Sequence, residues 1–279
     1  MLFRTVIALG EAVLGYFCTS LGFVLQKKGI GWLGFQGRKG PGYYRDLWTW
    51  GIGFALLNLA VLPNYLSLGV LNAYIVNAIS GLNIVFMIFL SRWILNEPLH
   101  PQDYLYTLIM CAAIVGINLA DGSGASVSTI QADFAYLAAA IPVGSLFIWF
   151  LLRVAKVLRP TSGLQALWLA AASGSMSGLM ITYMKILQLE RGTQLLSYLG
   201  SPYLYCFFTV SALSMVAIQM AYRMGSMILV GPAQFATTVF YPILAAYPIF
   251  SLPVNPVQVV CFIAIVTTVV LMVKDHARE

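Results

Sequence analysis

Glu11 is the one acidic residue well inside an apolar stretch of the chain, the run from Thr5 to Gln26. An ionised carboxylate is costly in a membrane, so such a group tends to bind a proton or a cation. Glu11 is therefore the first candidate to bind a cationic substrate, or a proton and a cationic substrate in alternation. The alternative is that it reaches the outer interface beside Arg4, seven residues earlier, or accepts a hydrogen bond from a neighbouring helix.

Amides and a hydroxyl in another apolar stretch, from Asn72 to Leu95, could supply neutral oxygen ligands. On a helical wheel Asn72, Ser80 and Asn83 lie close together. Asn77 lies at the edge of the same arc, which covers less than half of the circumference. The arc predicts either the lining of a hydrophilic cavity or a set of interhelical hydrogen bonds, which contribute about 0.6 kcal/mol each in a membrane.

Two other apolar stretches, residues 48–67 and 227–250, carry polar side chains of the same kind. They are Asn58, Asn64, Gln234, Thr237 and Thr238. Pro232 in the later stretch would also free a backbone carbonyl. One Glu among amides could bind a divalent cation that keeps several of its waters, with Glu11 as the candidate metal ligand.

Composition predicts what must position these residues. Of the 279 residues, 60% are hydrophobic and 9% are charged, whereas a soluble domain has about 25% charged residues. We therefore expect an all-α polytopic membrane protein. Windows of about 20 apolar residues predict nine transmembrane helices, at residues 5–26, 48–67, 71–95, 103–120, 133–157, 163–189, 202–222, 227–250 and 256–274. The first run ends without a small-residue cleavage site, so we expect a retained helix rather than a signal peptide.

Basic residues gather at the ends of these spans, which is typical of orientation in a bilayer rather than of nucleic-acid binding. Twelve Lys and Arg fall on one side, and three, Arg4, Lys185 and Arg191, fall on the other. This bias predicts an integral protein of the inner or plasma membrane with the N-terminus outside and the C-terminus in the cytoplasm. The most basic loop, from Lys27 to Asp46, also holds aromatic residues and predicts interfacial anchors or a site for lipid headgroups.

Residues of the same type recur along the chain at spacings of 157 and 155 residues. The pairs are Lys28 with Lys185, Tyr65 with Tyr222, Pro98 with Pro253, and Pro101 with Pro256. We predict one membrane transport domain, residues 1–279, built from two inverted four-helix repeats at about 1–120 and 163–276 and a connector helix at about 133–157. Such halves meet at a pseudo-two-fold axis with a site near the bilayer midplane. Chance similarity among apolar sequences is the alternative.

Three short motifs follow one another along the chain: GFVLQKKG from Gly22, LNEPL from Leu95, and Gln219-Met220 with Tyr222 and Pro232. In this order they resemble the magnesium-transporter family called NIPA, part of the drug/metabolite transporter (DMT, EamA-like) superfamily. The resemblance covers almost the whole chain. It implies a bundle of two inverted repeats that takes its substrate through a central cavity by alternating access, and it adds Gln219 to the candidate binding residues.

The chain departs from the family pattern at two places. The family's acid in the second span would fall near Val61, and a family proline is Ala78 here. A cation site would then need another source of negative charge. The resemblance implies Mg²⁺ transport as the first function to test. Proton-coupled export of small metabolites or drugs, and lipid flipping, are the alternatives.

Catalytic and cofactor chemistry find little support in the sequence. There is no Ser/His/Asp set and no pair of carboxylates, and the histidines His100 and His276 lie outside the apolar spans. We expect neither an enzyme nor a cofactor, and the widely separated cysteines are expected to be packed thiols. The expected partners are the small-molecule or cation substrate and the lipid bilayer. A monomer is expected because one chain holds both halves, with a homodimer as the alternative.

Two shorter patterns concern helix packing and helix ends. The small residues from Ala171 to Gly174 and at Ser177-Gly178 predict a close helix contact. Asn96-Glu97-Pro98 is expected to end the third span. Glu97 would then mark the helix end on the cytoplasmic side, where it tolerates water.

Overall fold

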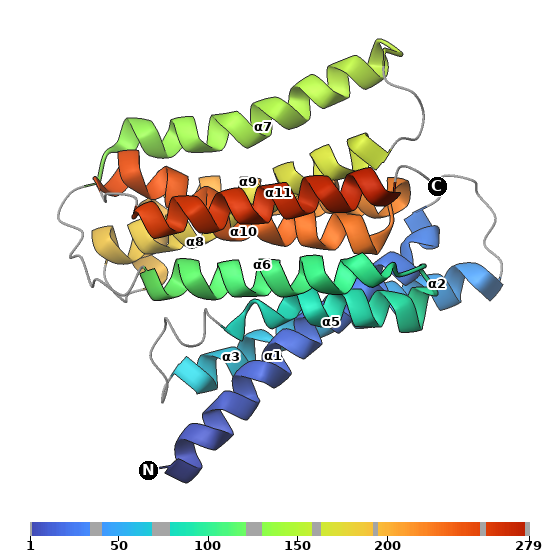
Figure 1. Cartoon of the computed structure of the whole chain (residues 1–279). Coiled ribbons are helices and arrows are strands. Elements are labelled where there is room, and N and C mark those ends of the chain that lie inside the picture. Colours follow the sequence, from blue (N-terminus) through green and yellow to red (C-terminus); the bar gives the residue numbers. More distant parts are fainter. Residues whose placement is uncertain are drawn as a thin grey trace. The chain divides into compact units, whose positions relative to one another are not determined.

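The computed structural model describes residues 2–33, 41–68, 79–120, 130–157, 163–191, 195–251 and 255–276 (Figure 1). All regular secondary structure in these ranges is helical. The chain divides into two compact units. Unit 1 comprises Met1–Ser123, Ser226–Gly231 and Asn255–Glu279, and unit 2 comprises Gly124–Gly225 and Pro232–Val254.

Unit 1 holds the N-terminal helices, the last helix and the first turn of α10. Its helices are α1 (Leu2–Lys28), η1 (Ile30–Leu33), α2 (Pro41–Leu59), α3 (Val61–Leu68), α5 (Leu82–Leu90), the π-helical turn η2 (Ser91–Leu95), α6 (Pro101–Ala120) and α11 (Pro256–His276). Unit 2 holds α7 (Ala132–Val154), α8 (Gly163–Arg191), η3 (Leu195–Gly200), α9 (Pro202–Met224) and the remainder of α10 (Met227–Phe250).

Seven of the described helices, α1 and α6 to α11, are long and apolar enough to cross a membrane. They confirm the all-helical membrane class, while nine crossing helices stay a prediction. The second predicted span, residues 48–67, is divided between α2 and α3 at Ala60, three residues before Pro63. Of the third predicted span, the structure describes residues 79–95, where α5 and η2 together form a shorter apolar segment.

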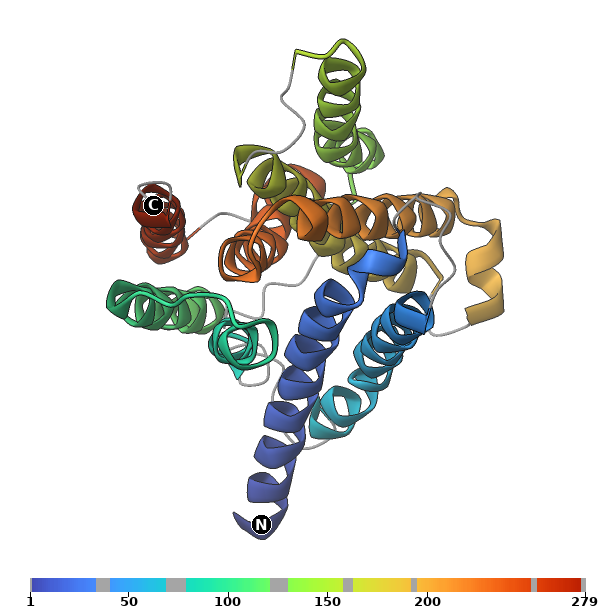
Figure 2. The same ribbon diagram turned by 90° about the vertical axis from the view of Figure 1, so that its right-hand side faces the viewer.

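Glycines bring α1 and α2 into close contact, and Figure 2 shows α2 and α3 running alongside α1. A Cβ atom on Gly22 would lie 2.8 Å from the backbone oxygen of Gly53, and one on Gly53 would lie 2.6 Å from the oxygen of Gly22. Gly29 meets the backbone of Asp46 in the same way. Because Gly22 meets Gly53 and Gly29 meets Asp46, the two helices run antiparallel.

The helices α6 and α11 form a second antiparallel pair, which is joined at both ends. Before α11, the Asn255 side-chain amide lies 3.5 Å from the carbonyl oxygen of Ala120 at the end of α6. At the opposite end, Nε2 of His276 lies 3.5 Å from the carboxylate of Asp103 at the start of α6. The predicted second repeat, residues 163–276, is therefore divided between the two units, since α11 belongs to unit 1. The inverted repeat stays a prediction.

Both helices of this pair begin with the same local arrangement. The backbone N–H of His100 donates to Oδ2 of Asp103 at 2.8 Å, and that of Asn255 donates to Oε1 of Gln258 at 3.1 Å. A proline, which needs no N–H partner at the first helical position, follows each capping residue. Two prolines that suggest the repeat thus occupy equivalent positions in two helices.

In unit 2, the small residues of α8 make close contacts, as predicted. A Cβ atom on Gly174 would overlap the backbone of Gln234 on α10. On α9, the hydroxyl of Ser214 lies 2.9 Å from that of Ser173 and 2.8 Å from that of Ser177. Small and hydroxylated side chains therefore hold α8 against two neighbours, as is usual for helices in lipid.

Candidate functional site

Glu11 lies on α1 at the border of its buried face. Ala8 and Ala12 are 1% and 0% exposed and pack against Tyr16 and Ile79. The Glu11 side chain is half-buried, and among the described residues it forms no hydrogen bond or ion pair. Arg4 is exposed and makes no ion pair with it in this part of the chain. The carboxylate is thus held on a spanning helix without a described partner.

The α1–α2 register places α3 near Glu11. Counting eleven residues back from Gly22 gives Glu11, and counting eleven on from Gly53 gives Asn64. Since α3 continues along α1 and contacts it, the backbones at Glu11 and Asn64 lie at about the same level. Among the described residues, the helix register thus places these two predicted site residues at the same level of neighbouring helices.

Asn83 is used in a contact between helices. It is 3% exposed, and the Ser20 hydroxyl of α1 lies 3.0 Å from both its backbone oxygen and its side-chain oxygen. Ser80, half-buried in the turn before α5, accepts the Asn83 backbone N–H through its carbonyl at 2.9 Å. At Asn83, then, the structure has the interhelical hydrogen bond. Asn72 and Asn77 lie outside the described residues.

Asn58 does not face the interior of unit 1. Its side chain is exposed on α2 and donates to the carbonyl of Phe54 in the same helix at 2.8 Å. This is the common way for an amide to satisfy its own donor on a helix surface. Nothing in this arrangement aims Asn58 at a ligand.

The remaining candidates belong to unit 2. Gln219 on α9 and Gln234 on α10 are buried, with 7% and 6% exposure. Thr237 donates its hydroxyl to the carbonyl of Ala233 or Gln234, and Thr238 donates to that of Gln234 at 2.9 Å. Both threonine hydrogens are therefore used within α10, which leaves only hydroxyl lone pairs for a ligand.

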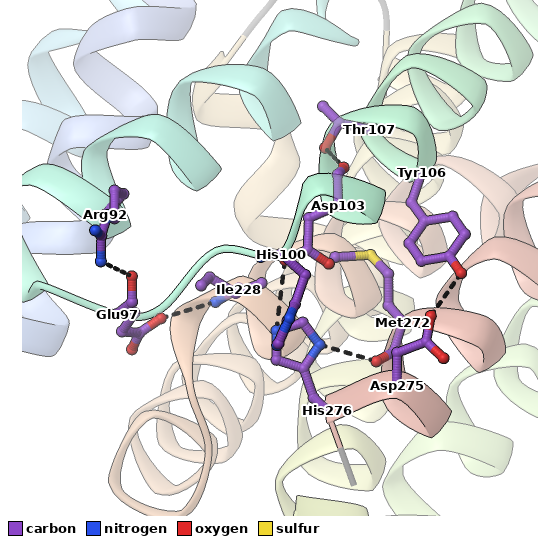
Figure 3. Close-up of polar contacts among 10 residues, drawn as sticks. All are labelled: Arg92, Glu97, His100, Asp103, Tyr106, Thr107, Ile228, Met272, Asp275 and His276. Carbon is purple, nitrogen blue, oxygen red and sulfur yellow. Dashed lines mark hydrogen bonds and ion pairs between the residues drawn. The ribbon is translucent and has the colours of Figure 1, made fainter. Parts of the chain in front are cut away.

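Glu97 follows the end of the third predicted span, as expected, but its side chain is mostly buried and paired. Its side chain is 13% exposed and places Oε1 3.1 Å from Nζ of Lys27, whose side chain is 12% exposed. The carboxylate also accepts the backbone N–H groups of Met227 at 2.8 Å and Ile228 at 3.0 Å. Figure 3 shows Glu97 turned toward the Ile228 nitrogen at the start of α10. One side chain thus joins α1, the segment after η2 and α10.

Local backbone geometry explains how Glu97 reaches α10. Asn96 ends η2 with a left-handed backbone, φ 56° and ψ 31°, a conformation that Asn tolerates better than most residues. The turn carries Glu97 away from the axis of α5. The first N–H groups of a helix have no partner within it and form the positive end of its dipole, so a carboxylate there is doubly favoured.

A second polar cluster ties the start of α6 to the end of α11 (Figure 3). Nδ1 of His276 lies 3.0 Å from the Met272 carbonyl, which can only accept, so Nδ1 carries a hydrogen. Nε2 faces the carboxylate of Asp103, so this contact is attractive when both ring nitrogens are protonated. Nearby, the Tyr106 hydroxyl donates to Asp275 at 2.7 Å. These contacts hold the start of α6 against the end of α11, which is a structural role.

Metal-binding geometry is limited in what the structure describes. No group of three or more His, Cys, Asp or Glu side chains in the described ranges is arranged to hold a metal ion. Comparisons with protein-family models, curated proteins and solved structures find no match.

Proposed function

We propose that the chain is a secondary transporter that moves a small polar or cationic solute across the membrane by alternating access. The observation that supports this proposal is the position of Glu11. Among the seven candidate spanning helices, it is the one Asp or Glu that lies more than a turn from a helix end. Ionisable side chains at such depth are rare in membrane proteins and generally serve substrate, ion or proton pathways.

The Glu11 carboxylate is half-buried on a candidate spanning helix. Its partners in a purely structural role would be a cationic side chain or hydrogen-bond donors, and no such partner occurs among the described residues. A proton or a cation would neutralise it. Binding one in place of the other is the basis of coupled exchange, in which the substrate leaves as the proton arrives.

The Lys27–Glu97 pair would close one end of the same helix. Glu11 and Lys27 are 16 residues apart on α1, about 24 Å at the usual helical rise. A solute held at Glu11 would thus be separated from that end of α1 by most of the membrane thickness. Access from that end would require the helices joined by Glu97 to move, whereas the ion pair would favour the state open to the other side.

The resemblance to the NIPA family makes Mg²⁺ the first substrate to test. Purified protein is reconstituted into vesicles that contain a Mg²⁺-sensitive dye, and influx is followed after external Mg²⁺ is added. We expect influx above that of protein-free vesicles and expect Glu11→Gln to abolish the excess. Glu190→Gln is the matched control, because Glu190 lies at the end of α8 and accepts a hydrogen bond from Ser201 at 2.9 Å.

The outcomes separate the alternatives. Absence of Mg²⁺ influx, with proton release from the purified protein when organic cations are added, would replace cation uptake by proton-coupled export. Movement of fluorescent phospholipids between leaflets, assayed by dithionite quenching, would favour a flippase. If Glu11→Gln leaves every one of these activities unchanged, the assignment of Glu11 as the binding residue is wrong.

A further inference from the structure

An open groove of about 590 Å³ lies between α1 and α5 in unit 1. Phe17 of α1 and Phe86 of α5 form its wall, with ring centroids 5.5 Å apart in an edge-to-face contact. Phe89 and Leu90 extend the apolar surface toward η2. The volume is in the range of small-molecule sites, about 300–1,000 Å³. Residues of both α1 and α5 line the groove, so it is more than one aromatic side chain on the surface of a single helix.

Polarity changes along the groove. Phe17 lies 11 residues before the end of α1, about 16 Å into the span at the helical rise. At the other end, Arg92 and Trp93 line the groove in the last turn before Asn96. Trp93 is 83% exposed, and Arg92 is exposed with one long contact of 3.4 Å to the Glu97 carbonyl. The groove is therefore apolar at depth and cationic where the span ends.

We propose that this groove binds one anionic phospholipid, with an acyl chain along Phe17, Phe86 and Phe89 and the headgroup phosphate on the Arg92 guanidinium. The match is one of both shape and charge. An acyl chain needs an apolar channel that descends from the interface, and a phosphate needs a cation at the channel mouth. Tryptophan prefers the same level of the bilayer, at the headgroups. A small soluble anion would gain nothing from the aromatic wall.

The Arg92 guanidinium supplies the selectivity for charge. A basic residue at the membrane surface favours anionic lipid by about fivefold, the factor that corresponds to about 1 kcal/mol. Neutral phosphatidylcholine shares the phosphate but carries a compensating choline. Phosphatidylglycerol should therefore occupy the groove at lower mole fractions than phosphatidylcholine does.

Trp93 provides a direct readout of occupancy. The protein is placed in phosphatidylcholine vesicles containing a small fraction of either dibromo-phosphatidylglycerol or dibromo-phosphatidylcholine, whose bromine atoms quench indole fluorescence on contact. The Trp93 signal is the difference between the chain and its Trp93→Phe variant. We expect half-maximal quenching at an about fivefold lower fraction of the brominated phosphatidylglycerol.

Charge variants distinguish a built site from ordinary lipid contact. Arg92→Gln should remove the preference for phosphatidylglycerol and Arg92→Lys should retain much of it. Arg223→Gln, the same loss of charge at the exposed end of α9, should leave it unchanged. Equal quenching by both lipids in the unmodified chain would overturn the proposal, as would a preference that survives Arg92→Gln. Native mass spectrometry of the same variants should show one retained phosphatidylglycerol that Arg92→Gln loses.

Discussion

Neutralising Glu97 should destabilise the protein more than neutralising its partner does. At 3.1 Å two unit charges attract by about 5 kcal/mol at an effective dielectric constant of 20, and much of this offsets the cost of removing both from water. Glu97→Gln removes the negative charge next to Nζ of Lys27, whose side chain is 12% exposed. Removing one partner of a buried pair costs about 3–5 kcal/mol, and we expect the lower end because both groups lie at helix ends.

The converse change is milder because Glu97 has other partners. In Lys27→Met the carboxylate still accepts the N–H groups of Met227 and Ile228 at the start of α10. We expect a loss of about 1.5 kcal/mol, the lower end of the range for one hydrogen bond to a charged group. The double variant removes both charges of the pair together, so Lys27→Met combined with Glu97→Gln should be more stable than Glu97→Gln alone.

Thermal unfolding of the purified protein can test this order. Four half-buried cysteines, one each on α1, α6, α9 and α11, can report unfolding through a thiol-reactive dye. At about 2–4 °C per kcal/mol, Glu97→Gln should lower Tm by roughly 6–12 °C. Lys28→Met, at the exposed neighbouring position, serves as the control and should leave Tm nearly unchanged. If the effects of the two single changes simply add in the double variant, Lys27 and Glu97 do not interact and the reasoning is refuted.

Two further changes test helix packing and capping by the same melting assay. Gly174→Ala should lower Tm by an amount equivalent to about 1–3 kcal/mol, because the new methyl group meets the backbone of Gln234, whereas Gly144→Ala on α7 has open space and should be neutral or stabilising. Asp103→Ala should lower the free energy of unfolding by about 1–2 kcal/mol, since it removes the acceptor for the His100 N–H and the partner of His276. Asp133 is an exposed acid in the first turn of α7, so Asp133→Ala should have little effect. Equal shifts in either pair would contradict the corresponding contact.

The membrane class and the positions of most helices could be predicted because they depend on local chain properties. Twenty or so apolar residues in a row favour a helix whatever surrounds them, and Pro101 and Pro256 start helices where the sequence predicts new spans. The division of the second span at Ala60 was missed, since length and hydropathy are continuous there. The cost of Pro63 depends on which neighbours can satisfy the freed carbonyls.

The contacts of the candidate site were harder to predict from the sequence. From the sequence, Asn83 could line a cavity or bind a neighbouring helix. Its hydrogen bond to the Ser20 hydroxyl becomes evident only when α1 and α5 are placed together. Glu97 was missed because its partners are Lys27 and the backbone of Met227, which lie far from it in sequence. One feature of the sequence did point to the ion pair, because Lys27 and Glu97 both follow predicted spans that end on the same side of the membrane. Charge alone does not reveal that a helix start lies within reach.

The ion pair also has a consequence for the order in which the protein is assembled during synthesis. Glu97 and Met227 are separated by 130 residues, so at 5–20 residues per second the ribosome makes Glu97 roughly 7–26 s before its backbone partner. Lys27 already exists by then, and the two charges can neutralise each other while the bilayer receives the later helices. Because α11 also belongs to unit 1, that unit is completed only after all of unit 2 has been translated. The Lys27–Glu97 ion pair would then be in place before the start of α10 binds to Glu97.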